Sequence, residues 1–165
     1  MKSLAMIPLA LVAFLAFVAC DELPDQSSTE ASAPVAALGA AATAPEEGWS
    51  LTVTKVSKRA TITGSGGRTT TALGVYLVVD LTLENTSKTQ QALCGNRFKL
   101  ADDQGRNYTF YEDGTNRLGK KELCAKISPG LAGPAVLVFD VPADATGVVL
   151  RGVGGIRVAL GDITA

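Results

Sequence analysis

Few residues of this chain are of types that act in catalysis or bind metals, and the three cysteines are the first of them to consider. The chain has no histidine, and its two methionines, Met1 and Met6, lie in an N-terminal apolar segment. Without imidazole, the usual ligand sets for zinc and copper and the Ser-His-Asp triads are absent. We therefore expect no metal site, no cofactor and no enzymatic activity.

The carboxylates of the chain could bind calcium or act as acids and bases. Residues 102–113, DDQGRNYTFYED, offer oxygen ligands for calcium. An EF-hand loop begun at Asp102 would need glycine at position six and glutamate at position twelve, where Asn107 and Asp113 stand. The pair Glu112 and Asp113 lies in a polar loop, where nothing indicates the raised pKa of a glycosidase acid. A hairpin turn is the better interpretation of this segment.

The first cysteine, Cys20, ends an apolar run that follows Lys2. The run is shorter than the roughly 20 residues of a membrane-spanning helix and fits a secretory signal. The stretch FVAC at 17–20 resembles the lipobox of bacterial lipoproteins, although Phe17 stands where leucine is usual. The resemblance implies a signal peptide over residues 1–19, lipidation of Cys20, and attachment to the extracytoplasmic side of the cell membrane.

Two alternatives stay open for this N-terminal segment. Ordinary cleavage would leave Cys20 as a free thiol, and an uncleaved run would form an anchor helix. All three interpretations place the rest of the chain outside the cytoplasm.

Residues 20–48 form an acidic segment rich in alanine, serine and proline, and we predict a disordered tether there. The segment contains six acidic residues and no lysine or arginine. Its apolar content is mostly alanine, which buries too little surface to offset the entropy of ordering. A short helix over residues 35–44 is the alternative, because alanine favours helix.

The charge is divided unevenly along the chain. Of its 15 basic and 16 acidic residues, 14 basic and 10 acidic ones remain from Trp49 onward. This mildly basic domain is compatible with solubility alone or with weak attraction to anionic envelope polymers or lipid headgroups. The basic residues are scattered, and we expect no nucleic-acid partner.

Residues 49–165 show strand patterns throughout. In 49–58, Trp49, Leu51 and Val53 alternate with polar residues. A Gly/Thr-rich loop is expected over 63–74. Further strands are expected over 75–85, in a hairpin over 97–111, and over 135–141, 147–152 and 155–163. The patterns predict an all-β, immunoglobulin-like β-sandwich of about seven strands, with a small barrel as the alternative.

Several of these segments carry a family resemblance. GVYLVVDLTLENTS, FKLADDQGRNY, ISPG and VFDVP follow one another in this order. Together they resemble the bacterial extracellular telokin-like immunoglobulin-like domains, largely a family of unknown function that is common in lipoproteins. The resemblance covers residues 49–152 and implies an exported module without established catalytic residues.

Cys94 and Cys124 are predicted to form a disulfide. If Cys20 carries lipid, an even number of cysteines remains in an oxidising compartment, which favours pairing. The bond would close a loop around the 97–111 hairpin and the basic segment 114–121. Two buried, reduced thiols are the alternative.

Three aromatic residues lie close together in the sequence. We expect Tyr108 and Phe110 to be in the core, and Tyr111, near Arg106 and Arg117, to be a candidate partner contact, because Tyr and Arg are enriched at interfaces. We therefore expect a lipid-anchored extracytoplasmic module that binds a protein or polymer of the cell envelope. The alternative is a structural or accessory envelope lipoprotein without a discrete ligand site.

Overall fold

The computed structural model describes residues 34–118 and 124–162. In these residues the chain forms ten strands, one short helix and two 3-10 turns. The strands are β1 (Ala41–Ala44), β2 (Trp49–Thr63), β3 (Thr69–Asn85), β4 (Gln91–Cys94), β5 (Lys99–Ala101), β6 (Asn107–Thr109), β7 (Cys124–Ile127), β8 (Ala132–Val141), β9 (Val148–Arg151) and β10 (Arg157–Gly161). The helix is α1 (Glu112–Arg117), and the 3-10 turns are Gly95–Arg97 and Val153–Gly155.

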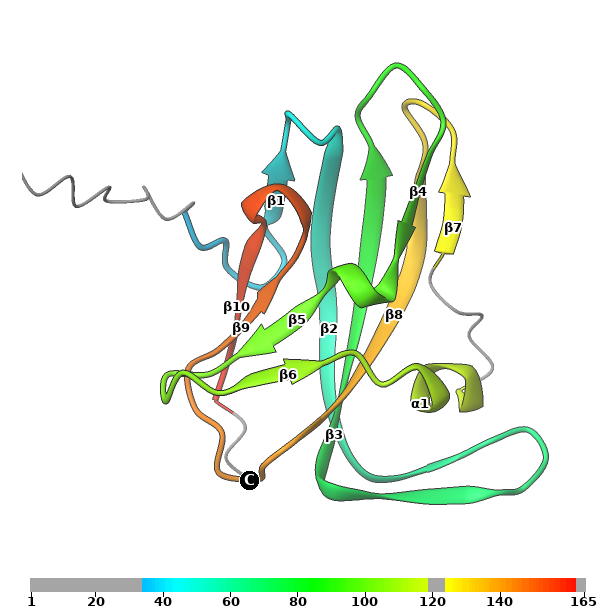
Figure 1. The fold of residues 1–165 in the computed structure, drawn as a ribbon, viewed down its shortest axis with the longest axis vertical. Helices are drawn as coiled ribbons and strands as arrows, with labels where there is room; N and C mark the ends of the chain where they lie inside the picture. Colours follow the sequence, from blue (N-terminus) through cyan, green and yellow to red (C-terminus); the bar gives the residue numbers. More distant parts are fainter. Residues whose placement is uncertain (1–33, 119–123, 163–165) are drawn as a thin grey trace, which may run out of the picture. The chain divides into compact units, whose positions relative to one another are not determined.

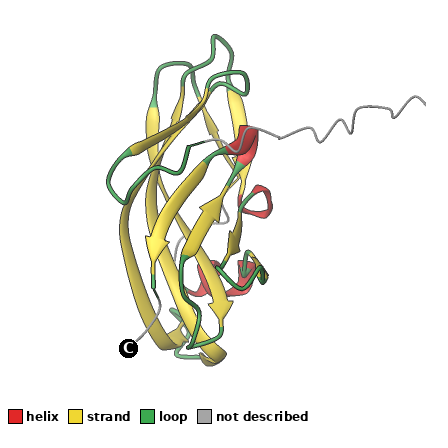
Figure 2. Cartoon of the chain, turned by 90° about the vertical axis from the view of Figure 1, so that its left-hand side faces the viewer, coloured by secondary structure: helices red, strands yellow, loops and turns green. Residues whose placement is uncertain are grey.

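The strands form two four-stranded antiparallel sheets and one two-stranded sheet. The first has the order β1-β2-β3-β8, the second has the order β10-β9-β5-β6, and β4 pairs with β7. Figure 1 shows the long strands β2, β3 and β8 side by side, and Figure 2 shows the strands packed as layers. The predicted all-β sandwich is confirmed, with ten strands in the described residues where about seven were expected.

The core lies between the two large sheets. Alternation along β3 and β8 places every second side chain in it, as the sequence predicts. Removing such a side chain from water contributes about 1.5–3 kcal/mol. Its buried members include Leu51, Val53, Leu77, Val79, Leu81, Leu83, Leu137 and Phe139 from the first sheet, and Leu100, Val148, Leu150 and Val158 from the second.

The loop predicted over 63–74 is confirmed only for residues 64–68, and its prediction is wrong for residues 63 and 69–74, which belong to strands. β2 continues to Thr63 and β3 begins at Thr69, so the two strands form a long hairpin whose far end we name the arm (residues 60–72). Threonine is β-branched and favours extended backbone. The hydroxyl oxygens of Thr63 and Thr69 lie 2.8 Å apart across the arm.

The arm leaves the sheet at an irregularity in the pairing of β2 with β3. The pairing passes from Arg59–Tyr76 to Thr61–Thr71, which leaves residues 72–75 outside the regular ladder. The carboxylate of Asp140 on β8 accepts hydrogen bonds from the backbone N–H groups of Leu73 and Gly74, at 2.9 and 3.1 Å. This carboxylate therefore satisfies two backbone donors that the irregularity releases from the ladder.

A second, smaller hydrophobic cluster lies on the opposite face of β3 and β8, beside α1. Its buried members include Ile62 from the arm and Tyr76 from β3, and Tyr111 and Leu118 pack against them. The rings of Tyr76 and Tyr111 are stacked with centroids 5.5 Å apart. A six-residue helix has too few turns to show an apolar period, so the sequence pattern gives no signal for α1.

Residues 36–48 belong to the folded domain, so the prediction of a disordered tether is wrong for this part. Ala36 pairs with Val158, and β1 pairs along β2. Ala42 and Ala44 are buried. Alanine buries little surface, but a sheet edge supplies backbone partners to any extended segment, and this pairing also excludes the alternative helix over 35–44.

The predicted signal peptide, Cys20 and the remainder of the predicted tether lie outside the described residues. No helix within residues 34–118 and 124–162 is long and apolar enough to cross a membrane.

Candidate binding site

One open side of the sandwich carries a cavity of about 490 Å³ between β2 and β10. We name it the seam pocket, because it lies where the two large sheets part. Four separate stretches of the chain supply its lining, which consists of Leu38, Val56, Ser57, Lys58, Leu77, Leu160 and Asp162.

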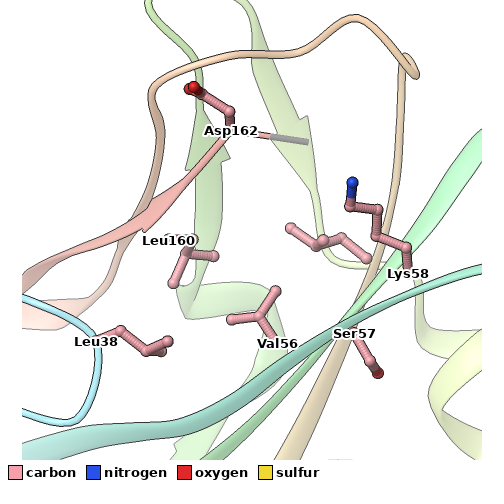
Figure 3. Close-up of a pocket in the computed structure, with 7 residues that line it drawn as sticks. Leu38, Val56, Ser57, Lys58, Leu160 and Asp162 are labelled. Atoms are coloured by element: carbon pink, nitrogen blue, oxygen red, sulfur yellow. The ribbon is translucent and has the colours of Figure 1, made fainter. Parts of the chain in front are cut away.

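Four apolar side chains line the seam pocket. Leu77 is buried at its base, and Val56 and Leu160 are half-buried. Leu38 is 51% exposed. Figure 3 shows Leu38, Val56 and Leu160 around the cavity, while Ser57 points away from it. A large apolar side chain held at the mouth of a cavity is a feature of surfaces that bind another molecule.

A one-residue bulge at Thr54 decides which side chains reach the pocket. Val53 is opposite Leu81 and Lys55 is opposite Asp80, so Thr54 is an additional residue in β2. One extra residue moves every later side chain to the other face of the strand.

The consequence of the bulge is that Val56 and Lys58 lie on the inner face. Their register partners on β3 are the buried Val79 and Leu77. Strict alternation from Trp49 would instead have placed Lys55 inward.

Charged groups of both signs stand at the rim of the seam pocket. Lys58 comes from β2, and Asp162 follows β10. The carboxylate of Asp162 also accepts a hydrogen bond from the Gly147 N–H at 2.8 Å. An apolar cavity with a few polar groups at its rim can hold a side chain and fix its orientation.

A buried carboxylate organises the turn of the β5–β6 hairpin. The side chain of Asp102 is 0% exposed and accepts hydrogen bonds from Arg106 Nε at 2.6 Å and from the Tyr108 hydroxyl at 2.7 Å. It also accepts the backbone N–H groups of Gln104 and Arg106. Gly105 has φ +76° and makes the turn that the sequence predicts.

These contacts shift two pKa values. Burial of the Asp102 carboxyl opposes its ionisation, but the hydrogen bonds from Tyr108 and Arg106 outweigh burial and lower the pKa of Asp102 to about 2. Burial, followed by the hydrogen bond to Asp102, raises the pKa of Tyr108 to about 12. These hydrogen bonds to the Asp102 carboxylate hold the turn of the hairpin in place.

The low pKa of Asp102 predicts an acid-dependent stability. The folded-state pKa lies below the ordinary value of 3.8, so the stabilisation is complete above about pH 4 and is lost as the pH falls toward 2. Urea unfolding of the wild-type chain and of Asp102→Asn between pH 2 and pH 7 measures this. We expect Asp102→Asn to be less stable at pH 7 and to depend less on pH below 4; equal slopes below pH 4 would contradict the assignment.

The structure separates the three predicted contact residues into two networks. Arg106 binds Asp102 and lies 3.4 Å from the Asp144 carboxylate. Arg117 Nε donates to Asp113 at 2.6 Å, and the Tyr111 hydroxyl donates to the same carboxylate at 3.3 Å. Tyr111 and Arg117 are thus together on α1 and its N-cap, Arg106 is not part of their network, and the contact role of all three stays a prediction.

The other two aromatic residues lie against the main core. Tyr108 and Phe110 are half-buried and pack against it, and the Phe110 ring meets Phe139 edge-on at 6.4 Å between centroids. In the described part of the chain, no group of three or more Cys, Asp and Glu side chains could hold a metal ion.

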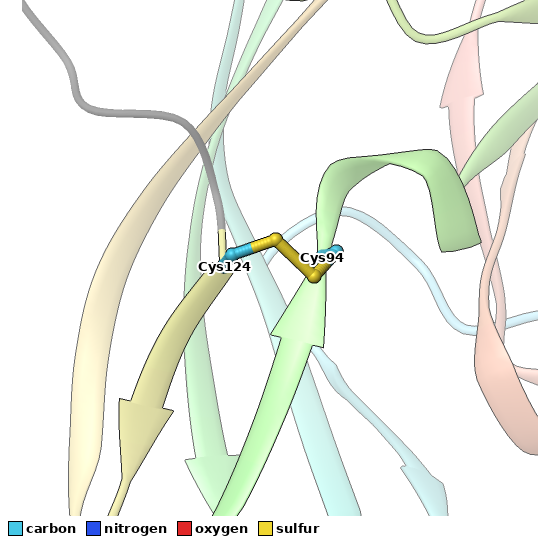
Figure 4. Close-up of a disulfide and its surroundings, with 2 residues drawn as sticks. All are labelled: Cys94 and Cys124. Carbon is cyan, nitrogen blue, oxygen red and sulfur yellow. A yellow bond between two sulfur atoms is a disulfide. The ribbon is translucent and has the colours of Figure 1, made fainter.

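The predicted disulfide between Cys94 and Cys124 is confirmed. The two residues are register partners at the end of β4 and the start of β7, and Figure 4 shows the bond between these strand ends. Leu93 and Ile127 on the same two strands are buried in the main core. The bond therefore closes a loop whose base is fixed to the sandwich.

Sequence reasoning missed the residues of the seam pocket. Leu38 lies in the segment interpreted as a tether, where Leu23, Val35 and Leu38 are the only large aliphatic residues. Such residues in an alanine-rich segment are the signal that could have indicated contact with a folded domain. No local pattern joins Leu38 to Val56 and Leu160, because their proximity arises from pairing between distant segments.

The sequence matches none of the curated proteins. Among solved structures, it is similar to a conserved hypothetical protein from Bacillus anthracis, with a TM-score of 0.58, 13% identity, and coverage of 78% of this chain and 95% of that chain. It is also similar to the secreted protein MPT63 from Mycobacterium tuberculosis, with a TM-score of 0.52, 17% identity, and coverage of 79% and 99%.

A third similar structure is ycdA, a candidate lipoprotein from Bacillus subtilis, with a TM-score of 0.50 and 16% identity. The similarity covers 64% of this chain and 31% of that chain. At such identities, these structures share the β-sandwich fold with this chain. Residues 43–158 match the family described as "Domain of unknown function (DUF4352)". Because this match runs from β1 into β10 and includes strands of both large sheets, the chain belongs to the DUF4352 family.

Proposed function

We propose that this protein is a lipid-anchored extracytoplasmic module that binds a protein or polymer of the cell envelope through the seam pocket. The observation that carries the proposal is the pocket itself, with buried Leu77 at its floor and exposed Leu38 at its mouth. Cavities of about 300–1,000 Å³ with apolar walls and few polar groups are the usual form of binding sites.

Three observations support the extracytoplasmic location. The stretch FVAC at 17–20 resembles a lipobox. The domain carries a disulfide, and disulfides persist in oxidising compartments. Structures of similar fold include a secreted protein and a candidate lipoprotein. Lipidation with two or more acyl chains would hold the protein at the membrane, whereas one chain gives only marginal binding.

The Cys20→Ala substitution should move the protein out of the membrane fraction or leave it unprocessed. Lipid attachment needs the thiol of this residue, so the variant has no acceptor for the acyl chains. Fractionation and intact mass of the full-length chain, expressed in a bacterium that processes lipoproteins, measure both outcomes. A variant that is processed and partitioned like the wild type would show that the lipoprotein interpretation is wrong.

A photo-crosslinker at Leu38 should capture the envelope partner in intact cells. We expect a discrete adduct with benzoylphenylalanine at Leu38 and none with the same group at Leu131, which is 59% exposed but does not line the seam pocket. Adding Leu160→Glu, which places a carboxylate in the apolar cavity, should abolish the adduct. The same adducts from both positions, or no adduct from Leu38, would count against the seam pocket as the binding site.

A further inference from the structure

β1 covers only the first residues on the outer edge of β2. It pairs with residues 49–52, after which the Gly39 N–H donates to the Val53 carbonyl at 3.0 Å and the chain crosses to β10 at Ala36. In the described part of the chain, no strand pairs with this edge of β2 between residues 55 and 63. The backbone of this segment can therefore accept a further strand.

The uncovered edge is positively charged. Lys55, Lys58 and Arg59 are exposed, and β2 contains no acidic residue. Asp80 is the cross-strand neighbour of Lys55, but the two form no ion pair among the described residues.

This charge pattern disfavours a second copy of the chain as the occupant. If two copies of β2 paired antiparallel about Ser57, Lys55 of each copy would lie opposite Arg59 of the other. Like charges directly opposite one another destabilise a strand pair, and lysines on an edge strand are a known protection against self-association. A strand that carries carboxylates has the complementary charge.

The side-chain directions along β2 define what such a strand would look like. After the bulge at Thr54, Lys55, Ser57 and Arg59 share the outer face, whereas Val56 and Lys58 face the seam pocket. Alternate residues of an added strand also face opposite sides. Acidic side chains on its outer face would meet Lys55 and Arg59, and an apolar side chain opposite Val56 would face the pocket.

We infer that residues 55–63 of β2 bind an extended, acidic peptide segment of a partner protein as an added strand, with one apolar side chain in the seam pocket. The backbone of the edge would form hydrogen bonds with the peptide backbone. The pocket would determine which side chain of the peptide can point inward. This inference rests on the proposed function, because the seam pocket is its apolar half.

The probe for this inference is a heptapeptide of alternating Glu and Val with blocked ends. Its binding to the full chain in mild detergent is measured by fluorescence anisotropy, and the site by hydrogen exchange with mass spectrometry. We expect new protection within residues 55–63 and weaker binding at high salt. A Lys/Val peptide, or a Glu/Val peptide with alternate backbone nitrogens methylated, should bind at least about tenfold more weakly.

Charge reversal in the protein provides the matched test. Lys55→Glu with Arg59→Glu should weaken Glu/Val binding about tenfold and strengthen binding of the Lys/Val peptide. Lys88→Glu with Lys126→Glu makes the same change in net charge at exposed positions outside the seam pocket and should change neither affinity.

Three outcomes would overturn the inference: equal binding of the N-methylated peptide, protection outside β2, or equal effects of the two charge reversals. If the N-methylated peptide bound equally well and polyphosphate displaced it, the site would bind polyanions instead of an added strand. No peptide binding, with the Leu38 adduct still formed in cells, would reject the added strand and leave the proposed function standing. Loss of that adduct as well would reject both.

Discussion

Replacing Cys94 and Cys124 with alanine should lower the free energy of unfolding by about 3.5 kcal/mol. The disulfide joins residues 30 positions apart, and the closed loop contains β5, β6 and α1. Without the bond, the unfolded chain regains the conformational freedom that the closed loop denies it. Urea unfolding of the wild-type and doubly substituted chains measures the difference.

Two controls separate this effect from other consequences of the substitution. Adding a reductant to the wild-type chain should reproduce the loss, whereas Cys20→Ala should leave the stability of the domain unchanged. Alkylation of the denatured, unreduced mature chain should add no group at Cys94 or Cys124 before reduction and two groups after it. Two groups added at these residues without reductant would contradict the bond.

Replacing Asn85 with alanine should destabilise the domain by about 3 kcal/mol, because the buried Ile127 carbonyl and the Thr89 carbonyl would lose their donor. Asn85 is 0% exposed. Its amide donates to the carbonyl oxygens of Thr89 and Ile127, each at 2.8 Å. Its side-chain oxygen accepts from the backbone N–H and the hydroxyl of Ser87, at 2.9 and 2.7 Å. One side chain thus joins the end of β3 to the turn that follows it and to the end of β7.

Asn96→Ala is the matched control for this prediction. Asn96 is exposed, and no hydrogen bond of its side chain is found among the described residues, so its replacement should stay within about 0.5 kcal/mol of the wild type. Thermal and urea unfolding of both variants supply the comparison. A loss at Asn85 no larger than the loss at Asn96 would mean that water replaces the amide donor without cost.

The strands that the sequence predicted are those with long, unbroken alternation. In β3, the apolar residues Leu77 to Leu83 recur at every second position, and in β8 the residues Leu137 to Val141 do the same. One buried face is enough to produce this pattern, whatever the strand pairs with. The Cys94–Cys124 bond could also be predicted from the sequence, because its formation depends on the number of cysteines and on the compartment.

The remaining elements depend on partners that a local pattern does not contain. β1 has the sequence AATA and is a strand because the edge of β2 satisfies its backbone groups. The bulge at Thr54 has no signal in the sequence pattern, yet because of it Val56 and not Lys55 faces the interior. The seam pocket depends on this bulge and on the crossing of residues 36–40, so neither its position nor its lining could be read from the sequence.

The crossing segment also determines how a mechanical load would enter the domain. Tension along the N-terminal segment would first load the pairing at Ala36, where two backbone hydrogen bonds, of 2.9 and 2.8 Å, join this residue to β10. Once these break, the load passes to Gly39 and then to β1, which would peel from β2 one residue pair at a time. Each step lengthens the uncovered edge of β2, from residues 55–63 toward 49–63. A pull on the N-terminal segment would thus uncover more of the edge of β2 and, because Leu38 lies in the crossing segment, would also take the seam pocket apart.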